Sequence, residues 1–143
     1  MIKKKILIAT GGTGGHIFPA LSLAKNLIKK NYDIILTTDK RGLNYLGDTS
    51  QINLKKITSS PLVKKNILTL IQSILIICYS TLKSLFLLSL NRPHIIIGMG
   101  GYSSFPVCIA AAILKIKFII YENNLIIGKA NKYLLPFAKK MFV

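Results

Sequence analysis

The feature that most constrains the fold is a continuous apolar run, Lys5–Thr10, that leads directly into a glycine-rich segment, Gly11–Gly15. A run without polar alternation is typical of a strand buried on both faces, as in a parallel sheet. The residues after the glycines have helical apolar spacing, and Pro19 falls where we expect a first turn that tolerates proline. A second apolar run, Asp33–Thr38, completes a predicted strand–helix–strand unit.

The rest of the chain continues this alternation. The expected elements are strands over Ile52–Ile57, Pro93–Ile97 and Lys117–Tyr121, helices over Pro106–Leu114 and Lys129–Lys140, and a strand that begins at Met141–Val143. Strands that alternate with helices predict an α/β fold with a Rossmann-like parallel sheet. Residues 1–143 are about the size of one domain. The short strand at the last residues suggests a fragment or a truncated reading frame.

The net charge is the unusual property of the composition. Twenty basic residues against four acidic ones give +16, and half of the residues are apolar, which excludes a disordered chain. A codon bias toward A and T could account for part of the lysine count, although not for the shortage of acidic residues. The excess otherwise indicates an anionic partner: nucleic acid, anionic lipid or a phosphorylated substrate. Cys78 and Cys108 are too few for a disulfide scaffold, and we expect them to be reduced core residues. No cluster has metal-ligand spacing.

One segment complicates the prediction of a soluble domain. Ile67–Leu90 is 24 residues long and carries a single charge, Lys83, so it is long enough to span a membrane. Eight polar residues interrupt it, which leaves three alternatives: a helix of a soluble domain with an apolar face, a helix lying in a membrane surface, or a true span. Lysines just upstream favour an anionic membrane surface. They are Lys55, Lys56, Lys64 and Lys65.

Three loops follow predicted strands and carry the residues that could bind a ligand or transfer a proton. They are Gly11–His16, Gly98–Ser104 and Glu122–Gly128. The carboxyl ends of parallel strands share one sheet edge, where open α/β folds bind ligands, so the loops are expected to meet there. Two glycine loops facing one cleft suit the two phosphates of a pyrophosphate. His16 could take a proton in that cleft, whereas His94, at the opposite end of a strand, is predicted to be structural.

Other interpretations of these loops stay open. The glycines could serve tight turns only, and Glu122 could cap a helix or pair with a lysine. A dinucleotide-binding domain would use Asp39 as the ribose-binding acid, but Ile17 occupies the place of the third fingerprint glycine. Nucleic-acid binding is not favoured, because the basic residues do not alternate with aromatic residues that could stack on bases.

The motifs together resemble the N-terminal domain of the MurG family, the bacterial UDP-GlcNAc transferases that convert lipid I to lipid II. The resemblance covers the chain from about Lys4 to Val143. The motifs that carry it are Gly11–Ala20 (GGTGGHIFPA), Gly98–Tyr102 (GMGGY), Glu122–Asn124 (ENN), Gly128 and Asn131. It implies an N-terminal acceptor domain of a GT-B glycosyltransferase, which associates with the cytoplasmic face of the inner membrane and requires no cofactor or metal.

The resemblance also implies roles for individual residues. His16 corresponds to a candidate general base, and Glu122 is the second expected catalytic residue. The glycine loops are expected to hold the pyrophosphate of lipid I, and part of the first loop and Asn124 to contact UDP-GlcNAc. The expected substrate-binding residues are Thr13, Gly14, Gly15, Gly100, Gly101, Tyr102 and Asn124.

The chain departs from the family pattern in two ways. The family's third loop usually begins His-Glu-Gln-Asn, whereas here it is Tyr121–Asn124 (YENN), which puts the fine donor geometry in doubt. The C-terminal domain, which supplies most of the nucleotide-sugar site, is absent from the sequence, so the chain alone is expected to be inactive. A separate donor domain would complete it. The alternative is a non-catalytic, membrane-bound module that binds polyprenyl pyrophosphate, or one subunit of a split glycosyltransferase.

Overall fold

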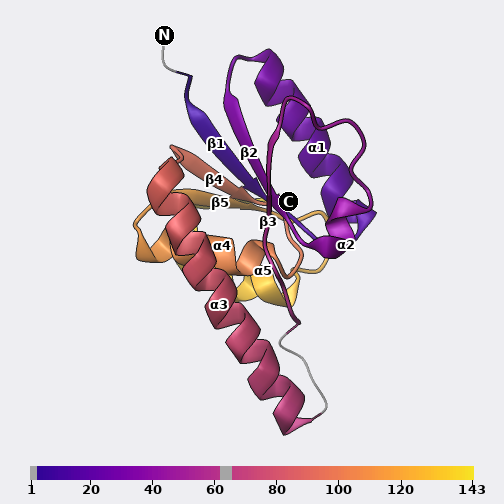
Figure 1. Cartoon of the computed structure of the whole chain (residues 1–143), viewed down its shortest axis with the longest axis vertical. Helices are drawn as coiled ribbons and strands as arrows, with labels where there is room; N and C mark the ends of the chain where they lie inside the picture. Colours follow the sequence, from indigo (N-terminus) through magenta and orange to yellow (C-terminus); the bar gives the residue numbers. More distant parts are fainter. Residues whose placement is uncertain (1–2, 62–65) are drawn as a thin grey trace.

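The computed structural model describes residues 3–61 and 66–143. Six strands form one sheet in the order β3-β2-β1-β4-β5-β6, and every neighbouring pair is parallel (Figure 1). The strands are β1 (Lys5–Ala9), β2 (Asp33–Thr38), β3 (Asn53–Lys56), β4 (Ile95–Gly98), β5 (Phe118–Tyr121) and β6 (Lys140–Phe142). The predicted α/β fold with a Rossmann-like parallel sheet is therefore confirmed.

Helices cover both faces of the sheet (Figure 1). They are α1 (Gly14–Lys29), α2 (Lys40–Leu43), α3 (Ile67–Asn91), α4 (Ser104–Ile113) and α5 (Lys129–Leu134). Successive side chains of a strand point to opposite faces, so Ile8 of β1 packs in a core with Ala20 and Ala24 of α1, and Leu7 packs in a second core with Leu88 of α3 and Val107 of α4. Burial on both faces explains why the strands are continuous apolar runs.

The strand order places a switch of direction between β1 and β4. From β1 the chain proceeds outward through β2 to β3, and α3 then carries it back to β4 on the other side of β1. The loops after β1 and β4 therefore leave adjacent strands and diverge, which opens a crevice at the carboxyl edge of the sheet. This is the edge at which the sequence predicts the three loops to meet.

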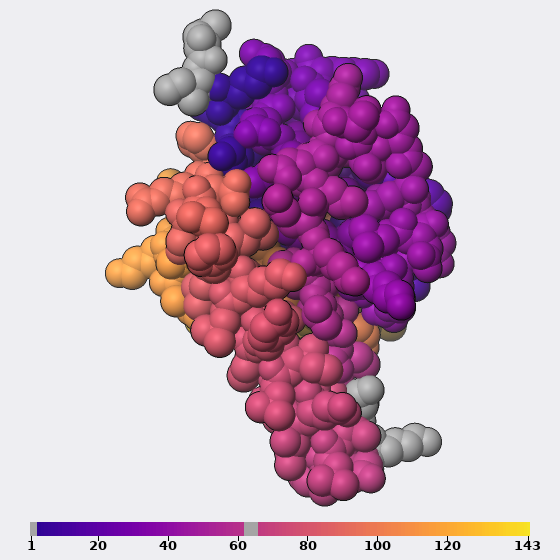
Figure 2. Space-filling model, viewed as in Figure 1, coloured from indigo at the N-terminus to yellow at the C-terminus, as the bar shows by residue number. Residues whose placement is uncertain are grey.

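Helix α3 buries three of its four serines and exposes many of its apolar residues. The buried residues are Ser73, Ser80, Ser84 and Leu88. The exposed apolar residues are Ile67, Leu68, Ile71, Ile74, Leu75, Tyr79, Leu82, Phe86 and Leu90. The hydroxyl of Ser80 donates to the Thr58 carbonyl at 2.7 Å, so the buried serines are hydrogen-bonded. The first half of α3 projects beyond the body of the domain (Figure 2).

Three local expectations are wrong. The predicted helix over Lys129–Lys140 ends at Leu134, because Pro136 cannot continue it, and a short 3-10 turn over Leu135–Phe137 leads into β6. Pro19 lies inside α1 rather than in its first turn, because the helix already begins at Gly14. Cys78 is exposed on α3, whereas Cys108 is buried as expected, and burial raises the pKa of the Cys108 thiol to about 12.

Candidate functional site

The loops after β1 and β4 pack backbone against backbone. Gly101 has a φ of +79°, and a Cβ on it would overlap the carbonyl of Gly11. The Ser103 hydroxyl donates to the Thr10 carbonyl at 2.8 Å, and a Cβ on Gly11 would overlap that hydroxyl. Only glycine allows both approaches, so the two glycine loops form a single fixed unit at the switch point.

The imidazole of His16 lies in this unit. His16 is in the first turn of α1, and its carbonyl accepts a hydrogen bond from the Thr10 hydroxyl at 3.1 Å. Its ring packs on Gly100, whose φ is +82°: a Cβ there would lie 2.8 Å from the ring atoms Nδ1 and Cε1. The Nδ1 atom is buried without a hydrogen-bond partner among the described residues. The first loop thus supplies the histidine, and the second sets its position.

The third loop is organised by the buried carboxylate of Glu122. Its Oε1 accepts from the backbone N–H (3.1 Å) and side-chain amide (2.9 Å) of Asn124, and its Oε2 accepts from the Gly128 N–H and the Asn131 amide, both at 2.9 Å. Burial by itself would raise the pKa of Glu122, but these hydrogen bonds favour the ionised form and bring the pKa below its ordinary value. In the structure, Glu122 shapes the loop and the start of α5; its catalytic role stays a prediction.

A chain of hydrogen bonds ties the third loop to the first. Pro19 has no N–H, so the carbonyl of Gly15 lacks the partner that residue 19 would otherwise provide in α1. The side-chain amide of Asn123 donates to that carbonyl at 3.2 Å, and the Tyr121 hydroxyl donates to the Asn123 Oδ1 at 3.3 Å. The two positions at which the third loop departs from the family pattern, Tyr121 and Asn123, therefore contact each other.

The three loops and the start of α5 line an open pocket of about 190 Å³. It is lined by predicted site residues from all three loops, namely His16, Gly100, Gly101, Tyr102, Glu122 and Asn124, and also by Gly128, Lys129, Ala130 and Asn131. Sequence reasoning missed Lys129; its position after Gly128, at the start of α5, was the available signal. Thr13, Gly14 and Gly15 lie at the start of α1 outside this lining, and Gly14 packs near Phe18 and Tyr45.

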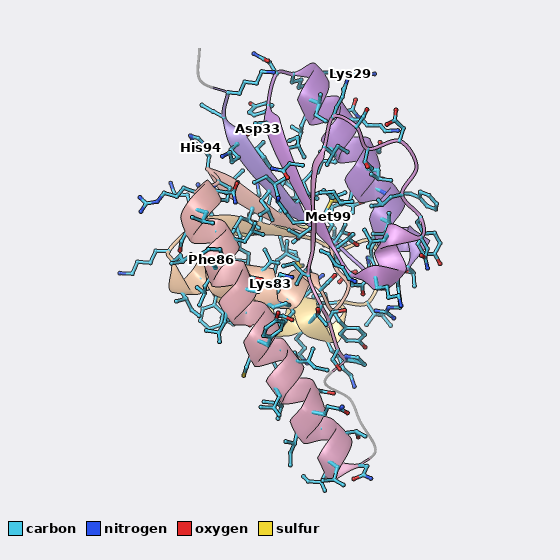
Figure 3. The ribbon with its side chains drawn as sticks, viewed as in Figure 1. Lys29, Asp33, Lys83, Phe86, His94 and Met99 are labelled. Carbon is cyan, nitrogen blue, oxygen red and sulfur yellow. The ribbon has the colours of Figure 1, made fainter. Side chains whose placement is uncertain are left out.

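His94 is far from this pocket. It precedes β4, while Met99 directly follows that strand, and the two lie at opposite ends of it (Figure 3). The Nδ1 of His94 accepts a hydrogen bond from the backbone N–H of Lys5 at 3.2 Å. The N–H of Met99 donates to the Ala9 carbonyl at 2.8 Å, on the loop side. This hydrogen bond, and the distance of His94 from the loops, support the structural role predicted for it.

A second buried carboxylate, Asp39, fixes the first glycine loop from the β2 side. Its Oδ1 accepts from the N–H groups of Gly42 (2.8 Å) and Gly12 (3.1 Å), and its Oδ2 accepts from the Ser59 hydroxyl (2.9 Å) and the Arg41 guanidinium (3.1 Å). Burial by itself would raise the pKa of Asp39, yet these hydrogen bonds outweigh it and hold the pKa below its ordinary value. With both oxygens occupied, Asp39 is not placed to bind a ribose.

The contact between the glycine loops makes a prediction for stability. Gly101→Ala should lower the free energy of unfolding by about 2 kcal/mol or more, because the new Cβ combines a strained φ with overlap of the Gly11 carbonyl. Gly47→Ala is the matched control: nothing lies within 4 Å of its added Cβ, and the change should stay within about 0.5 kcal/mol. Urea denaturation measures both. If Gly101→Ala and Gly47→Ala are equally stable, the close contact between the two glycine loops is contradicted.

The Asp39 network predicts a pH-dependent loss of stability. Because the pKa of Asp39 is lower in the folded chain than in the unfolded chain, ionised Asp39 stabilises the fold above about pH 4. That stabilisation is lost as the pH falls through the folded-state value. Asp39→Asn should therefore lower the free energy of unfolding by about 1–3 kcal/mol near pH 7 and by progressively less in acid. Urea denaturation at several pH values measures this difference. Ser59→Ala removes one of the four hydrogen bonds and should lower the free energy of unfolding by less. If the effect of Asp39→Asn does not depend on pH, ionised Asp39 does not stabilise the fold in this way.

Comparisons of sequence place the chain among known proteins. The glycosyltransferase family 28 N-terminal domain matches residues 6–143. A curated relative from Pelagibacter ubique is named UDP-N-acetylglucosamine--N-acetylmuramyl-(pentapeptide) pyrophosphoryl-undecaprenol N-acetylglucosamine transferase. It is 37% identical over 141 residues, which cover 99% of this chain and 39% of the relative. A relative of the same name from Rhodospirillum rubrum is 36% identical, over 90% of this chain and 33% of its own length. The chain thus spans less than two-fifths of these relatives.

Solved structures agree with the fold. The crystal structure of Acinetobacter baumannii MurG superposes with a TM-score of 0.80 at 25% identity, and the match covers 96% of this chain and 40% of that one. A Streptomyces glycosyltransferase matches with a TM-score of 0.62 at 15% identity, over 92% of this chain and 42% of that one, and supports the fold alone. The family match over nearly the whole sequence, with the expected GT-B N-terminal fold, shows that this chain belongs to glycosyltransferase family 28, by its N-terminal domain.

Proposed function

We propose that this chain is the acceptor-binding domain of a transferase that moves GlcNAc from UDP-GlcNAc to lipid I, which yields lipid II for peptidoglycan synthesis. The observation that carries the proposal is the meeting of the three loops at the switch point of the sheet, where His16 of the first loop packs on Gly100 of the second and lines a pocket with residues of the third. The names of the relatives describe the same reaction and a pyrophosphoryl-undecaprenol acceptor. Residues 1–143 are proposed to form the acceptor- and membrane-associating domain.

In the proposed reaction, the acceptor hydroxyl attacks the anomeric carbon of GlcNAc and displaces UDP with inversion. The new carbon–oxygen bond forms as the bond to the β-phosphate breaks, and His16 takes the hydroxyl proton. The pyrophosphate of the acceptor binds the backbone of Gly100 and Gly101 and the N-terminus of α1, where the helix dipole favours an anion. Lys129, which also lines the pocket, adds a positive charge.

A second domain is proposed to supply most of the UDP-GlcNAc site, either in the same polypeptide or as a separate chain. On this chain, Thr13, Gly14, Gly15 and Asn124 are proposed to contact the donor. Their place beside the pocket supports this, because Asn124 lines it and the first loop adjoins it. Glu122, with both oxygens already bonded, is proposed to act by holding Asn124 in place rather than by touching the sugar.

The domain is proposed to dock peripherally on the anionic cytoplasmic face of the inner membrane through the apolar face of α3. This helix is long and apolar enough to cross a membrane by length and composition, and little of it is buried in the domain. Exposed Lys55 and Lys56, together with Lys83 on α3 itself (Figure 3), would face lipid phosphates. Lys64 and Lys65 lie outside the described residues.

Catalysis by His16 can be tested in an enzyme completed with a donor domain. His16→Ala should reduce turnover by about 100-fold or more, because the general base is lost. His94→Ala is the matched control, since the other histidine lies at the far end of β4, and its turnover should be close to that of the unchanged enzyme. The measurement is transfer of radiolabelled GlcNAc to lipid I. Unchanged turnover in His16→Ala would remove His16 from the chemistry.

Membrane docking can be tested by sedimentation with liposomes. The chain should bind vesicles that contain anionic phosphatidylglycerol, and binding should weaken as salt is raised. Leu75→Ser with Tyr79→Ser, both on the exposed face of α3, should reduce binding by about ten-fold or more. Leu125→Ser, at a fully exposed apolar residue outside α3, is the control. If the chain does not bind anionic vesicles at low salt, the proposed membrane docking is wrong.

A non-catalytic module that binds polyprenyl pyrophosphate is the second candidate. It is favoured by one observation: the pocket between the loops and the apolar face of α3 both lie within this chain and need no donor domain. The two candidates separate when the chain is combined with a donor domain from a relative. Transfer of GlcNAc supports the transferase. Binding of prenyl pyrophosphate without transfer supports the module.

A further inference from the structure

A second, larger cavity opens beside the loop pocket. It has a volume of about 460 Å³, within the usual range for small-molecule sites. The two cavities share Tyr102, Lys129 and Ala130, so they adjoin along the second loop and the start of α5. A ligand that fills the loop pocket can therefore extend into this cavity without leaving the domain surface.

The chemistry of the cavity is amphipathic. Its wall is mainly apolar and comes from three helices: Ile77 of α3, Phe105 of α4 and Tyr133 of α5. Lys129 and Lys132, both exposed on α5, add two positive charges. No carboxylate belongs to the described lining, so the charges are not neutralised from within the cavity. Such a site suits an apolar chain attached to an anion.

Ile77 connects the cavity to helix α3, because it belongs to both. Ile77 is half-buried on α3, and Ile74, one turn earlier on the same side of the helix, belongs to the exposed apolar residues of α3. The cavity therefore lies between the loops, where an anion is proposed to bind, and the helix that is proposed to meet the membrane. An apolar chain leaving the loops toward a bilayer would pass through it.

We propose that this cavity, the α3–α5 groove, holds the first isoprene units of a prenyl pyrophosphate whose phosphates sit between the glycine loops. The inference rests on the proposed function and specifies the part of the acceptor that this chain recognises. The relatives are named for a pyrophosphoryl-undecaprenol substrate, which has the required combination of anion and apolar chain. Lys129, common to both cavities, lies where the phosphates join the chain.

The groove can be tested on the isolated chain by titration calorimetry with geranyl pyrophosphate and with inorganic pyrophosphate. Geranyl pyrophosphate should bind at least about ten-fold more tightly, with a more negative heat-capacity change, because its chain buries apolar surface. If inorganic pyrophosphate binds and the geranyl chain adds no affinity, the proposed role of the groove is wrong while the proposed function stands. If neither ligand binds, both are overturned.

Substitutions inside and outside the groove show where the geranyl chain binds. Ile77→Ser and Tyr133→Ser should each remove most of the geranyl advantage and leave the affinity for inorganic pyrophosphate unchanged. Tyr133 is 62% exposed, so this variant is expected to fold even if Ile77→Ser does not. Leu82→Ser, on the exposed face of α3, is the matched control. If Leu82→Ser removes the advantage and the groove variants do not, the chain binds the outer face of α3 and the inference is wrong.

Discussion

The contact between Gly101 and the carbonyl of Gly11 is the constraint on which the site depends. It joins the loops that follow β1 and β4 at the one place where the strand order reverses, and no side chain separates them. The ring of His16 lies against Gly100 in the same unit. Because the contact is between backbones, the geometry of the pocket is set by the sheet itself rather than by flexible side chains.

Two buried carboxylates hold the loops around this contact. Asp39 binds the first loop through the Gly12 N–H, and Glu122 binds the third loop through Asn124 and Gly128. They are two of only four acidic residues in a chain of net charge +16. Each carboxylate accepts four hydrogen bonds, Asp39 from the first glycine loop, α2 and Ser59, and Glu122 from the third loop and α5. Of the basic side chains, Arg41 pairs with Asp39, and most of the positive surface charge is left for partners outside the domain.

The sequence predicts the sheet well because its strands are buried on both faces and so appear as continuous apolar runs. The meeting of the three loops follows from parallel strand direction alone. Other features depend on contacts that no spacing reveals. Pro136 shortens the last helix, and the many donors to Glu122 come from a loop whose path sequence alone does not define. In α3, serine and leucine are both helically spaced, and only hydrogen bonds such as Ser80 to Thr58 decide which face turns inward.

The hydrogen bonds from Tyr121 to Asn123 and from Asn123 to Gly15 have a consequence for how this loop can change. The Gly15 carbonyl needs a donor from outside α1 because Pro19 cannot supply one. Asn123 meets that need, and Tyr121 orients its amide. Exchanging either residue alone for its counterpart in the family pattern would change the reach of one member of this chain of bonds, because glutamine is one methylene longer than asparagine and histidine is shorter than tyrosine. The two positions therefore form one unit of variation, and sequences are expected to move between the two loop types by paired substitution.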